Sequence, residues 1–410
     1  MSALELGVRN ALLLQGPMGP FFRHFADELQ AQGIQVTKLN FNAGDALYFR
    51  GPEARSYRGR LDGLGAYFEQ LMREQRIDGV FLFGDGRPVH RKAIEVAQRL
   101  GIRVFVFEEG YMRPDWITLE EGGVNGHSSL PRDPAFYRAF SHEEVPEAVR
   151  VKSSFGRAGW FSTAYSIALT LGFFAYPYYR HHRPLNAFVE AFRWVRGGLR
   201  KQIFVRRERG LTEWLSETRH KQFFLVAMQV HCDYQLVHSP FDSVEQFLEQ
   251  VMASFAKHAP KTQSLVIKSH PLDRPYREHG PLIRRLSQRF GLEGRVTHVH
   301  DLHLPTLLRH ASGVVMINST VGLQAVQAGT PVKVLGHAVY DMAGLTYQGS
   351  LEAFWRDPGS VDLELYKGFR AHLMQANQAN GSFYRQLSQS PLKAGLIWPP
   401  ALTDGSAIKS

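Results

Sequence analysis

The chain has 410 residues, 44% of them hydrophobic and 21% charged, and carries a net charge of +10 with its 18 histidines counted as neutral. This composition excludes a disordered or collagen-like chain, and the length suits two domains better than one core. A net positive charge suits binding to nucleic acid, to anionic lipid or to an anionic substrate, and it does not distinguish among these ligands.

The first 130 residues alternate short apolar runs with helical stretches. Strands are predicted at residues 10–14, 34–39, 80–83 and 104–107, and helices at 21–32, 61–75 and 89–100. Strands that are apolar throughout and alternate with helices indicate a parallel sheet covered on both faces.

A mostly apolar and aromatic stretch at residues 160–179 is followed by a basic stretch at 180–209. Such a pair resembles an interfacial membrane anchor, because apolar side chains enter the headgroup boundary while Lys and Arg meet anionic lipid. The alternative is a buried helix followed by a solvated basic helix. Pro177 and several hydroxyl side chains argue against a helix that spans the bilayer.

The same rhythm of strands and helices returns from residue 223. Strands are predicted at 223–227, 265–268, 296–299, 313–317 and 332–335, and helices at 244–257, 276–290, 304–310 and 321–328. The predicted fold class is α/β, with two Rossmann-like doubly wound domains facing a cleft, as in the GT-B glycosyltransferase plan. The expected divisions are an N-terminal domain at 1–150, a membrane-associating linker at 151–215, a C-terminal domain at 216–350, and C-terminal helices at 351–410 that could pack back on the first domain.

The single cysteine, Cys232, cannot form an intramolecular disulfide, which is typical of a reducing compartment. The first residues, Met-Ser-Ala-Leu-Glu-Leu, lack the basic start and apolar core of a secretory signal. We therefore expect a cytoplasmic protein.

Two polar motifs follow strands of the second half at their carboxyl ends. Lys268-Ser269-His270-Pro271 follows one strand, and Asn318-Ser319-Thr320 follows another and opens a helix. Carboxyl ends of one parallel sheet can converge, and hydroxyls with free N–H groups at a helix start form an anion site. His270 and Lys268 add groups able to stabilise a departing phosphate. The alternative is that Ser319 only caps the helix and His270 only shapes a turn.

A third motif, residues 229–239, directly follows the strand at 223–227. Its carboxylate, Asp233, could act as a nucleophile or base, or could only cap the next turn. Gln229 and Gln235 are candidates for the donor side of a site, and His238 and Ser239 for binding a sugar carboxylate or the acceptor.

Polar residues also follow the strands of the first half. Glu108 and Glu109 are adjacent and must point to opposite faces, so only one should face the cleft. Arg113 could neutralise that acid or hold a substrate carboxylate. Gln15 with Gly16 in one loop, and Asp85 in another, are candidates for binding the sugar carboxylate or the acceptor. Neither loop carries a Walker lysine or the dinucleotide fingerprint.

His270-Pro271 and Ser319-Thr320 resemble the His-Pro and Ser/Thr pair motifs of bacterial sialyltransferases and related CMP-sugar enzymes. Over most of its length, to about residue 350, the chain resembles the capsule polysaccharide biosynthesis/export family of KpsS and LipB type. The blocks that carry this resemblance are residues 15–22, 38–45, 83–85, 109–114, 123–126, 229–235, 268–271 and 318–320.

The resemblance implies a retaining β-Kdo transferase that moves Kdo from CMP-Kdo to a phosphatidylglycerol-type lipid, starting the poly-Kdo linker of a capsule. It implies double displacement, with Asp233 as nucleophile and Glu109 as acid/base for the acceptor hydroxyl. His270 and the Ser319-Thr320 helix start would hold the CMP phosphate, with no metal and no other cofactor. The protein would lie on the cytoplasmic face of a Gram-negative inner membrane, with other capsule biosynthesis and export proteins as further possible partners.

Two other functions fit the same residues. One is an inverting transferase for sialic acid or another CMP-sugar, in which a carboxylate acts only as a base. The other is a non-catalytic export or assembly protein that binds lipid-linked polysaccharide, although a scaffold has no need of polar clusters at three strand ends. Nucleic acid is not expected as a partner, because the basic stretch adjoins an apolar one and no recognition motif.

Overall fold

The computed structural model describes residues 4–181, 187–230 and 234–403. The chain forms two compact units, and each is interrupted in sequence. Unit 1 comprises Met1–Leu130, Glu144–Glu190 and Ala371–Ser410, and unit 2 comprises Pro131–Glu143 and Ala191–Arg370. The units therefore cross the divisions expected at residues 150, 215 and 350, because three separate segments of chain form unit 1 and two form unit 2.

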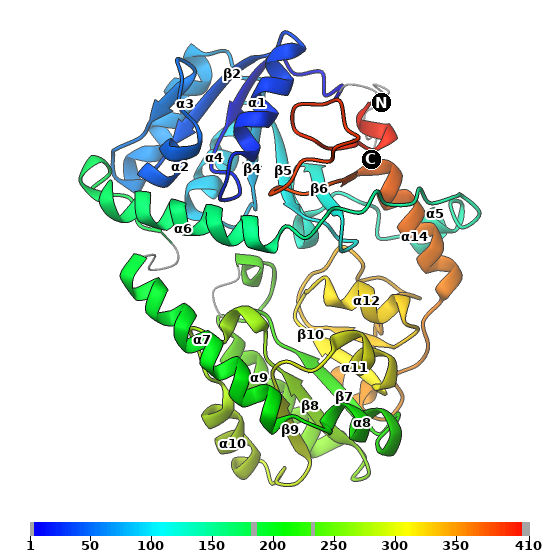
Figure 1. The fold of residues 1–410 in the computed structure, drawn as a ribbon. Coiled ribbons are helices and arrows are strands. Elements are labelled where there is room, and N and C mark those ends of the chain that lie inside the picture. Colours follow the sequence, from blue (N-terminus) through cyan, green and yellow to red (C-terminus); the bar gives the residue numbers. More distant parts are fainter. Residues whose placement is uncertain (1–3, 182–186, 231–233, 404–410) are drawn as a thin grey trace. The chain divides into compact units, whose positions relative to one another are not determined.

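Unit 1 is built on a seven-stranded sheet with the order β12-β6-β5-β4-β1-β2-β3 (Figure 1). Strands β1 to β5 are parallel, and β6 and β12 add an antiparallel edge. The strands are β1 (Asn10–Leu13), β2 (Gln35–Asn40), β3 (Ala54–Ser56), β4 (Gly79–Phe83), β5 (Arg103–Glu109), β6 (Trp116–Glu121) and β12 (Gln378–Asn380).

Apolar cores lie on both faces of this sheet. One core joins Phe25 of α1 to Phe81 and Phe107 of the sheet and to Trp398 of the C-terminal segment. The other packs α3 and α4 on the opposite side chains of the same strands. The helices of unit 1 are α1 (Phe21–Ala31), α2 (Ala43–Tyr48), α3 (Leu64–Glu74), α4 (Pro88–Arg99) and α6 (Phe155–Leu171). This is the doubly wound arrangement that continuously apolar strands predict.

Unit 2 holds a five-stranded sheet that is parallel throughout, with the order β11-β10-β7-β8-β9. The strands are β7 (Phe223–Ala227), β8 (Ser264–Lys268), β9 (Val296–Val299), β10 (Gly313–Met316) and β11 (Val332–Val334). The helices are α5 (Pro134–Arg138), α8 (Leu211–Glu213), α9 (Val244–His258), α10 (Gly280–Arg289), α11 (Leu304–His310), α12 (Val321–Gln327) and α13 (Leu351–Phe354). Helices α7 (Ala187–Arg207) and α14 (Leu363–Ala376) each begin in one unit and end in the other.

The predicted α/β class with two doubly wound halves is confirmed. The predicted strands agree with the structure to within one residue at nearly every end. The helix expected from residue 276 begins only at Gly280, because Pro281 occupies its first turn, where a missing N–H costs nothing. The sequence analysis missed the short edge strand β3, and also β6 and β12, which pair with each other across more than 250 residues of chain.

The apolar and basic stretches form α6 and α7 and are largely exposed. Phe174, just after α6, is 83% exposed, and the outer side chains of α7 include Phe192 and Leu199. The alternative of buried helices is therefore wrong for these side chains. Among the residues that the structure describes, no helix is both long and apolar enough to cross a membrane.

A buried carboxylate on α1 ties the C-terminal segment to unit 1. Glu28 accepts hydrogen bonds from the Trp398 indole N–H (2.7 Å) and the Ala394 N–H (2.9 Å). Burial raises the pKa of Glu28, although both hydrogen bonds oppose the shift. One acceptor group thus satisfies two donors that have left water.

Glu28→Ala should lower the free energy of unfolding by about 2–4 kcal/mol, because it leaves both buried donors without their acceptor. Urea unfolding followed by fluorescence measures the change. The exposed Glu74→Ala serves as control and should stay within about 0.5 kcal/mol of wild type. Equal stability of the two variants would contradict the role given to Glu28.

Candidate functional site

The Lys268-Ser269-His270 motif lies where it was predicted, at the carboxyl end of β8. Lys268 is buried and donates from Nζ to the His300 carbonyl (2.8 Å), and burial lowers its pKa. The Ser269 hydroxyl lies 2.8 Å from Nε2 of His298 on β9. His270 Nδ1 accepts from the Leu272 N–H (3.1 Å), so His270 does cap the short turn Pro271–Asp273.

The Asn318-Ser319-Thr320 motif follows β10 and leads into α12. Ser319 Oγ accepts from the Val321 N–H (3.3 Å), and the Ser319 carbonyl accepts from the Tyr340 hydroxyl. A Cβ on Gly322 would lie only 2.1 Å from that hydroxyl, so glycine is required for this approach. The turn is therefore held rigidly by the core of unit 2, while Ser319 and Thr320 remain partly exposed.

The carboxyl end of β7 lies between these two motifs, because β7 pairs with both β8 and β10. Gln229 donates from Nε2 to Asn318 Oδ1 (2.7 Å), and Asn318 donates to the His238 carbonyl (3.4 Å). Gln229, His238 and Asn318 are all buried. The structure thus brings together, at one sheet edge, most of the donor-side residues predicted from sequence.

Not every residue of the third motif can be placed. Asp233 lies outside the described residues, and so does the side chain of Gln235. Ser239 donates to the Leu236 carbonyl (2.7 Å) and accepts from the Phe241 N–H (3.3 Å), which stabilises the turn after β7. The sugar-binding roles expected for His238 and Ser239 stay predictions.

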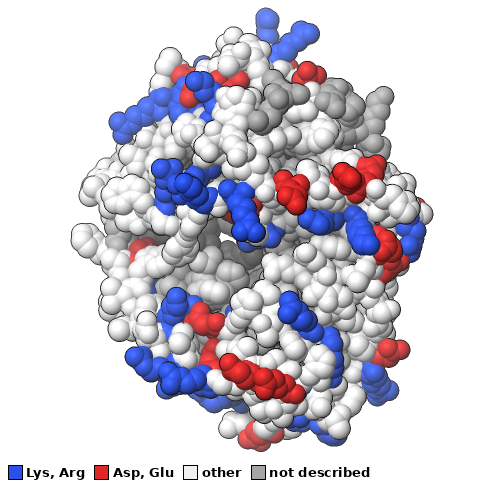
Figure 2. Space-filling view, turned by 45° about the vertical axis from the view of Figure 1, so that its right-hand side comes forward, with Lys and Arg blue, Asp and Glu red and all other residues white. Residues whose placement is uncertain are grey.

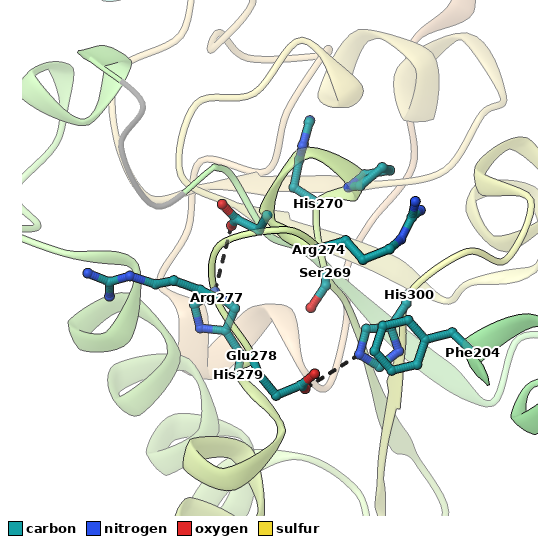
Figure 3. A pocket seen from close by; sticks show the side chains of 10 residues that line it. Phe204, Ser269, His270, Arg274, Arg277, Glu278, His279 and His300 are labelled. Atoms are coloured by element: carbon teal, nitrogen blue, oxygen red, sulfur yellow. Dashed lines mark ion pairs between the residues drawn. The ribbon is translucent and has the colours of Figure 1, made fainter. Parts of the chain in front are cut away.

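A pocket opens beside His270 in unit 2. It is a shallow depression, open to solvent, and is lined by Phe204, Ser269, His270, Pro271, Asp273, Arg274, Arg277, Glu278, His279 and His300. Figure 3 shows the His270 ring projecting away from the end of the pocket where Glu278 and His300 face each other. Arg274 forms an ion pair with Asp301 at the same loop. The pocket lining therefore combines cationic side chains with the carboxylates of Asp273 and Glu278, and Arg277 pairs with Glu245 outside it.

Two carboxylates and an aromatic ring fix His300. Glu208 lies 2.7 Å from Nδ1, Glu278 lies 3.7 Å from Nε2, and the Phe204 ring stacks on the imidazole at 3.5 Å. Burial opposes the charged imidazolium, but the two carboxylates outweigh it and raise the pKa of His300. The nearby His300 imidazole in turn lowers the pKa of Glu278 to about 2.

The neighbouring His298 has the opposite electrostatic environment. Burial, and then the charge on His300, lower the pKa of His298 to about 3, so its imidazole is neutral. One ligand atom each from Glu278, His298 and His300 lie within 4.8 Å of one another, close enough to hold a divalent cation. Glu278 and His300 already form an ion pair with each other, so a divalent cation could bind here only if the His300 imidazolium lost its proton.

In unit 1, Gln15 lies at the end of β1 in a buried polar network. Its Nε2 donates to the hydroxyls of Tyr165 and Tyr179 (both 3.0 Å) and to Asp45. The Tyr165 hydroxyl donates to Asp45 (3.0 Å), and burial raises the pKa of Tyr165 well above its ordinary value. Gln15 therefore ties α6 to the sheet, which is a structural role not foreseen from the sequence.

A small pocket adjoins this network. Its lining includes Gly16, Arg23, Lys38, Asp45 and Tyr165. Burial lowers the pKa of the Lys38 ammonium to about 8, although Asp45 opposes the shift. Gly16 thus lies beside cationic groups, as expected for an anion-binding loop, while its carboxylate- or acceptor-binding role stays a prediction.

The other predicted residues of unit 1 occupy neighbouring strand ends. Asp85 is buried and accepts from His127 Nδ1 (3.0 Å) and the Val124 N–H (3.4 Å). Alternation along β5 puts Glu109 on the face of Phe107, and Glu108 on the opposite face, where it approaches Gly84. Arg113 is exposed and donates to the Gly110 carbonyl (3.3 Å).

The sequence analysis missed the side chains around His300. Phe204 and Glu208 lie one turn apart at the end of α7, whereas Glu278 comes from the loop before α10, 70 positions later in the sequence. The alternating His298-Val-His300-Asp301 at the end of a predicted strand was an available signal. On the face seen in Figure 2, Lys and Arg occur in separate groups interspersed with acids, so the net positive charge forms no single basic surface there.

Comparison with known proteins gives a consistent family match. A family model described as capsule polysaccharide biosynthesis protein matches residues 78–384, which is most of the chain. The Escherichia coli capsule polysaccharide export protein KpsS is 41% identical over 387 residues, covering 92% of this chain and 98% of that protein. The capsule polysaccharide modification protein LipB of Neisseria meningitidis serogroup A is 37% identical over 386 residues, covering 92% of each.

A solved structure of similar length is KpsC of Thermosulfurimonas dismutans, described as a beta Kdo 2,7 transferase. It has 14% sequence identity and a TM-score of 0.41, over 91% of this chain and 92% of that chain.

The ion pairs of His300 predict a pH dependence of stability. Because the folded pKa is raised, the contribution is fully present below the unfolded value of 6.5 and is lost as the pH rises through the folded pKa. His300→Gln should therefore cost about 1–2 kcal/mol below pH 6.5 and progressively less at higher pH.

Urea unfolding at a series of pH values measures this difference. The exposed His142→Gln is the matched control and should leave the stability curve unchanged. A constant difference between His300→Gln and wild type at all pH values would contradict a charged, paired His300.

Proposed function

Because the chain belongs to the capsule polysaccharide biosynthesis family, we propose that it is a glycosyltransferase that moves Kdo from CMP-Kdo to a phosphatidylglycerol-type lipid with retention of configuration. The transfer would start the poly-Kdo linker of a Gram-negative capsule at the inner-membrane surface. The observation that carries the proposal is the sheet edge of unit 2, where the ends of β7, β8 and β10 gather Gln229, His270 and Asn318.

This edge suits a nucleoside monophosphate leaving group. Ser319 and Thr320 are partly exposed at the start of α12, and His270 caps a turn at the neighbouring strand end. Hydroxyls, an imidazole and backbone N–H groups are the donors that phosphate prefers. They would stabilise the charge that builds up on CMP as its bond to the sugar breaks, and the proposal assigns no metal to this step.

The reaction would proceed in two displacements. The Asp233 carboxylate attacks the anomeric carbon of Kdo, and the bond to phosphate breaks with its electrons leaving on CMP. Glu109 then takes the proton of the acceptor hydroxyl, whose oxygen attacks the same carbon and releases Asp233. Two inversions restore the original configuration. The roles of Asp233 and Glu109 rest on the family resemblance of their sequence blocks.

A non-catalytic capsule export role is the second candidate, and the description of the Escherichia coli relative as an export protein favours it. Such a protein would bind lipid-linked polysaccharide without consuming CMP-Kdo. Release of CMP that depends on the lipid acceptor distinguishes the two.

Asp233→Asn should abolish transfer and leave CMP binding intact, because it removes the nucleophile and not the phosphate donors. The assay uses CMP-Kdo with a short-chain phosphatidylglycerol, and mass spectrometry detects the product. NMR of the wild-type product should show the β configuration. An inverted product, or full activity of Asp233→Asn, would sink the double displacement.

His270→Ala should weaken CMP binding about 10-fold to 100-fold, the loss expected for a hydrogen bond to a charged phosphate. Titration calorimetry measures the affinity. His142→Ala is the control, because His142 is an exposed histidine of the same unit. Unchanged affinity in His270→Ala would refute the placement of the nucleotide.

A further inference from the structure

Helix α7 has its polar and apolar faces reversed relative to unit 2. Along residues 191–207, the side chains turned toward the unit are mainly Arg196, Gly197 and Arg200, together with Phe204. A separate stripe of exposed apolar side chains consists of Phe192, Val195, Leu199 and Ile203, exposed by 68%, 64%, 63% and 45%. A helix on a water-soluble protein normally buries its apolar stripe and exposes its charges.

The inward face is held by specific contacts, so the reversal is built into the packing. Arg196 donates to the Pro275 and Tyr276 carbonyls, and Arg200 donates to the Arg274 carbonyl (2.9 Å). A Cβ on Gly197 would lie 2.9 Å from the Pro275 ring, so the helix backbone approaches the loop closely there. The helix cannot turn its apolar stripe inward without losing these hydrogen bonds.

The residues that hold α7 also border the pocket beside His270. Phe204 stacks on His300, and Glu208, directly after the helix, accepts from the His300 and Asp301 N–H groups (2.8 and 3.1 Å). Arg274 lines the same pocket. Figure 1 shows α7 as one long helix at the surface of unit 2. The same helix therefore presents an apolar stripe outward and supports the His270 loop inward.

We propose that the outward face of α7 binds the surface of an anionic lipid bilayer. The apolar stripe would enter the headgroup boundary, and the exposed cations Lys201, Arg206 and Arg207 would meet the lipid phosphates. This charge complementarity favours a lipid surface over a second copy of this basic chain. This inference deepens the proposed function and rests on its lipid acceptor. A bilayer bound to α7 would lie next to the loop that contains His270, and that bilayer would contain the lipid acceptor.

Helix α6 shows the same reversal in unit 1. Its buried residues are Tyr165 and Ser166, and the Tyr165 hydroxyl bonds to Asn42 and Asp45, whereas Trp160 and Leu171 are exposed. This exposed apolar face of unit 1 is a second surface of the kind that binds lipid. Loss of the α7 face alone should therefore weaken membrane binding without abolishing it.

The test is flotation of the purified full chain with vesicles of phosphatidylcholine, alone or mixed with phosphatidylglycerol, without sugar nucleotide. Wild type should bind the mixed vesicles and bind less as salt is added. Phe192→Gln/Val195→Gln/Leu199→Gln should bind about tenfold or more weakly, because each apolar side chain lost from the bilayer removes a favourable transfer term. Adding Trp160→Gln/Leu171→Gln should abolish binding.

The control is Leu61→Gln/Leu363→Gln, which removes exposed leucines elsewhere and should bind as wild type. Lys201→Gln/Arg206→Gln/Arg207→Gln should lose the preference for phosphatidylglycerol. Wild-type binding by the α7 triple variant, or no binding by wild type, would overturn the inference. So would a lipid-free dimer that the triple variant disrupts while its vesicle binding is unchanged. CMP affinity, measured separately, distinguishes this failure from failure of the proposed function.

Discussion

The parallel direction of all five strands in unit 2 is the constraint on which its site depends. Parallel strands deliver every following loop to one edge of the sheet, and β7, at the centre, pairs with both β8 and β10. The strands are buried, so their register cannot slip without turning apolar side chains away from the core. His270 and Asn318, 48 positions apart in the sequence, are therefore held on either side of Gln229.

Hydrogen bonds of charged side chains connect this sheet edge to the end of α7. Glu208 accepts from the backbone and the side chain of His300, and Phe204 covers the ring. A buried carboxylate is stable in this place because each hydrogen bond replaces one lost from water. The end of α7 is thereby fixed to β9, and the arginines of its inner face hold the loop after His270.

A buried carboxylate with several hydrogen-bond donors also stabilises unit 1, at the end of β1. Asp45 is buried and accepts from the Phe41 N–H, from Gln15 and from Tyr165, so its charge is compensated from several directions. The Tyr165 contact fixes α6, whose other face is apolar and exposed. In both units, polar contacts on the inner side of a helix determine which side of that helix is exposed. The exposed side is the one that we propose to bind lipid.

The sequence by itself determined the strands of the two parallel sheets except β3, most helices and the polar residues at the strand ends. These features are local: an apolar run between turn residues predicts a buried strand, and the residues after it then lie at the carboxyl edge. Only the tertiary structure decided the pairing of β6 with β12, the burial of Gln15, the surroundings of His300 and the outward stripe of α7. Each depends on partners distant in sequence. A helix with apolar and basic residues can bury either face. In α7 the basic face is the inner one, because carbonyl groups of the loop after His270 accept hydrogen bonds from Arg196 and Arg200.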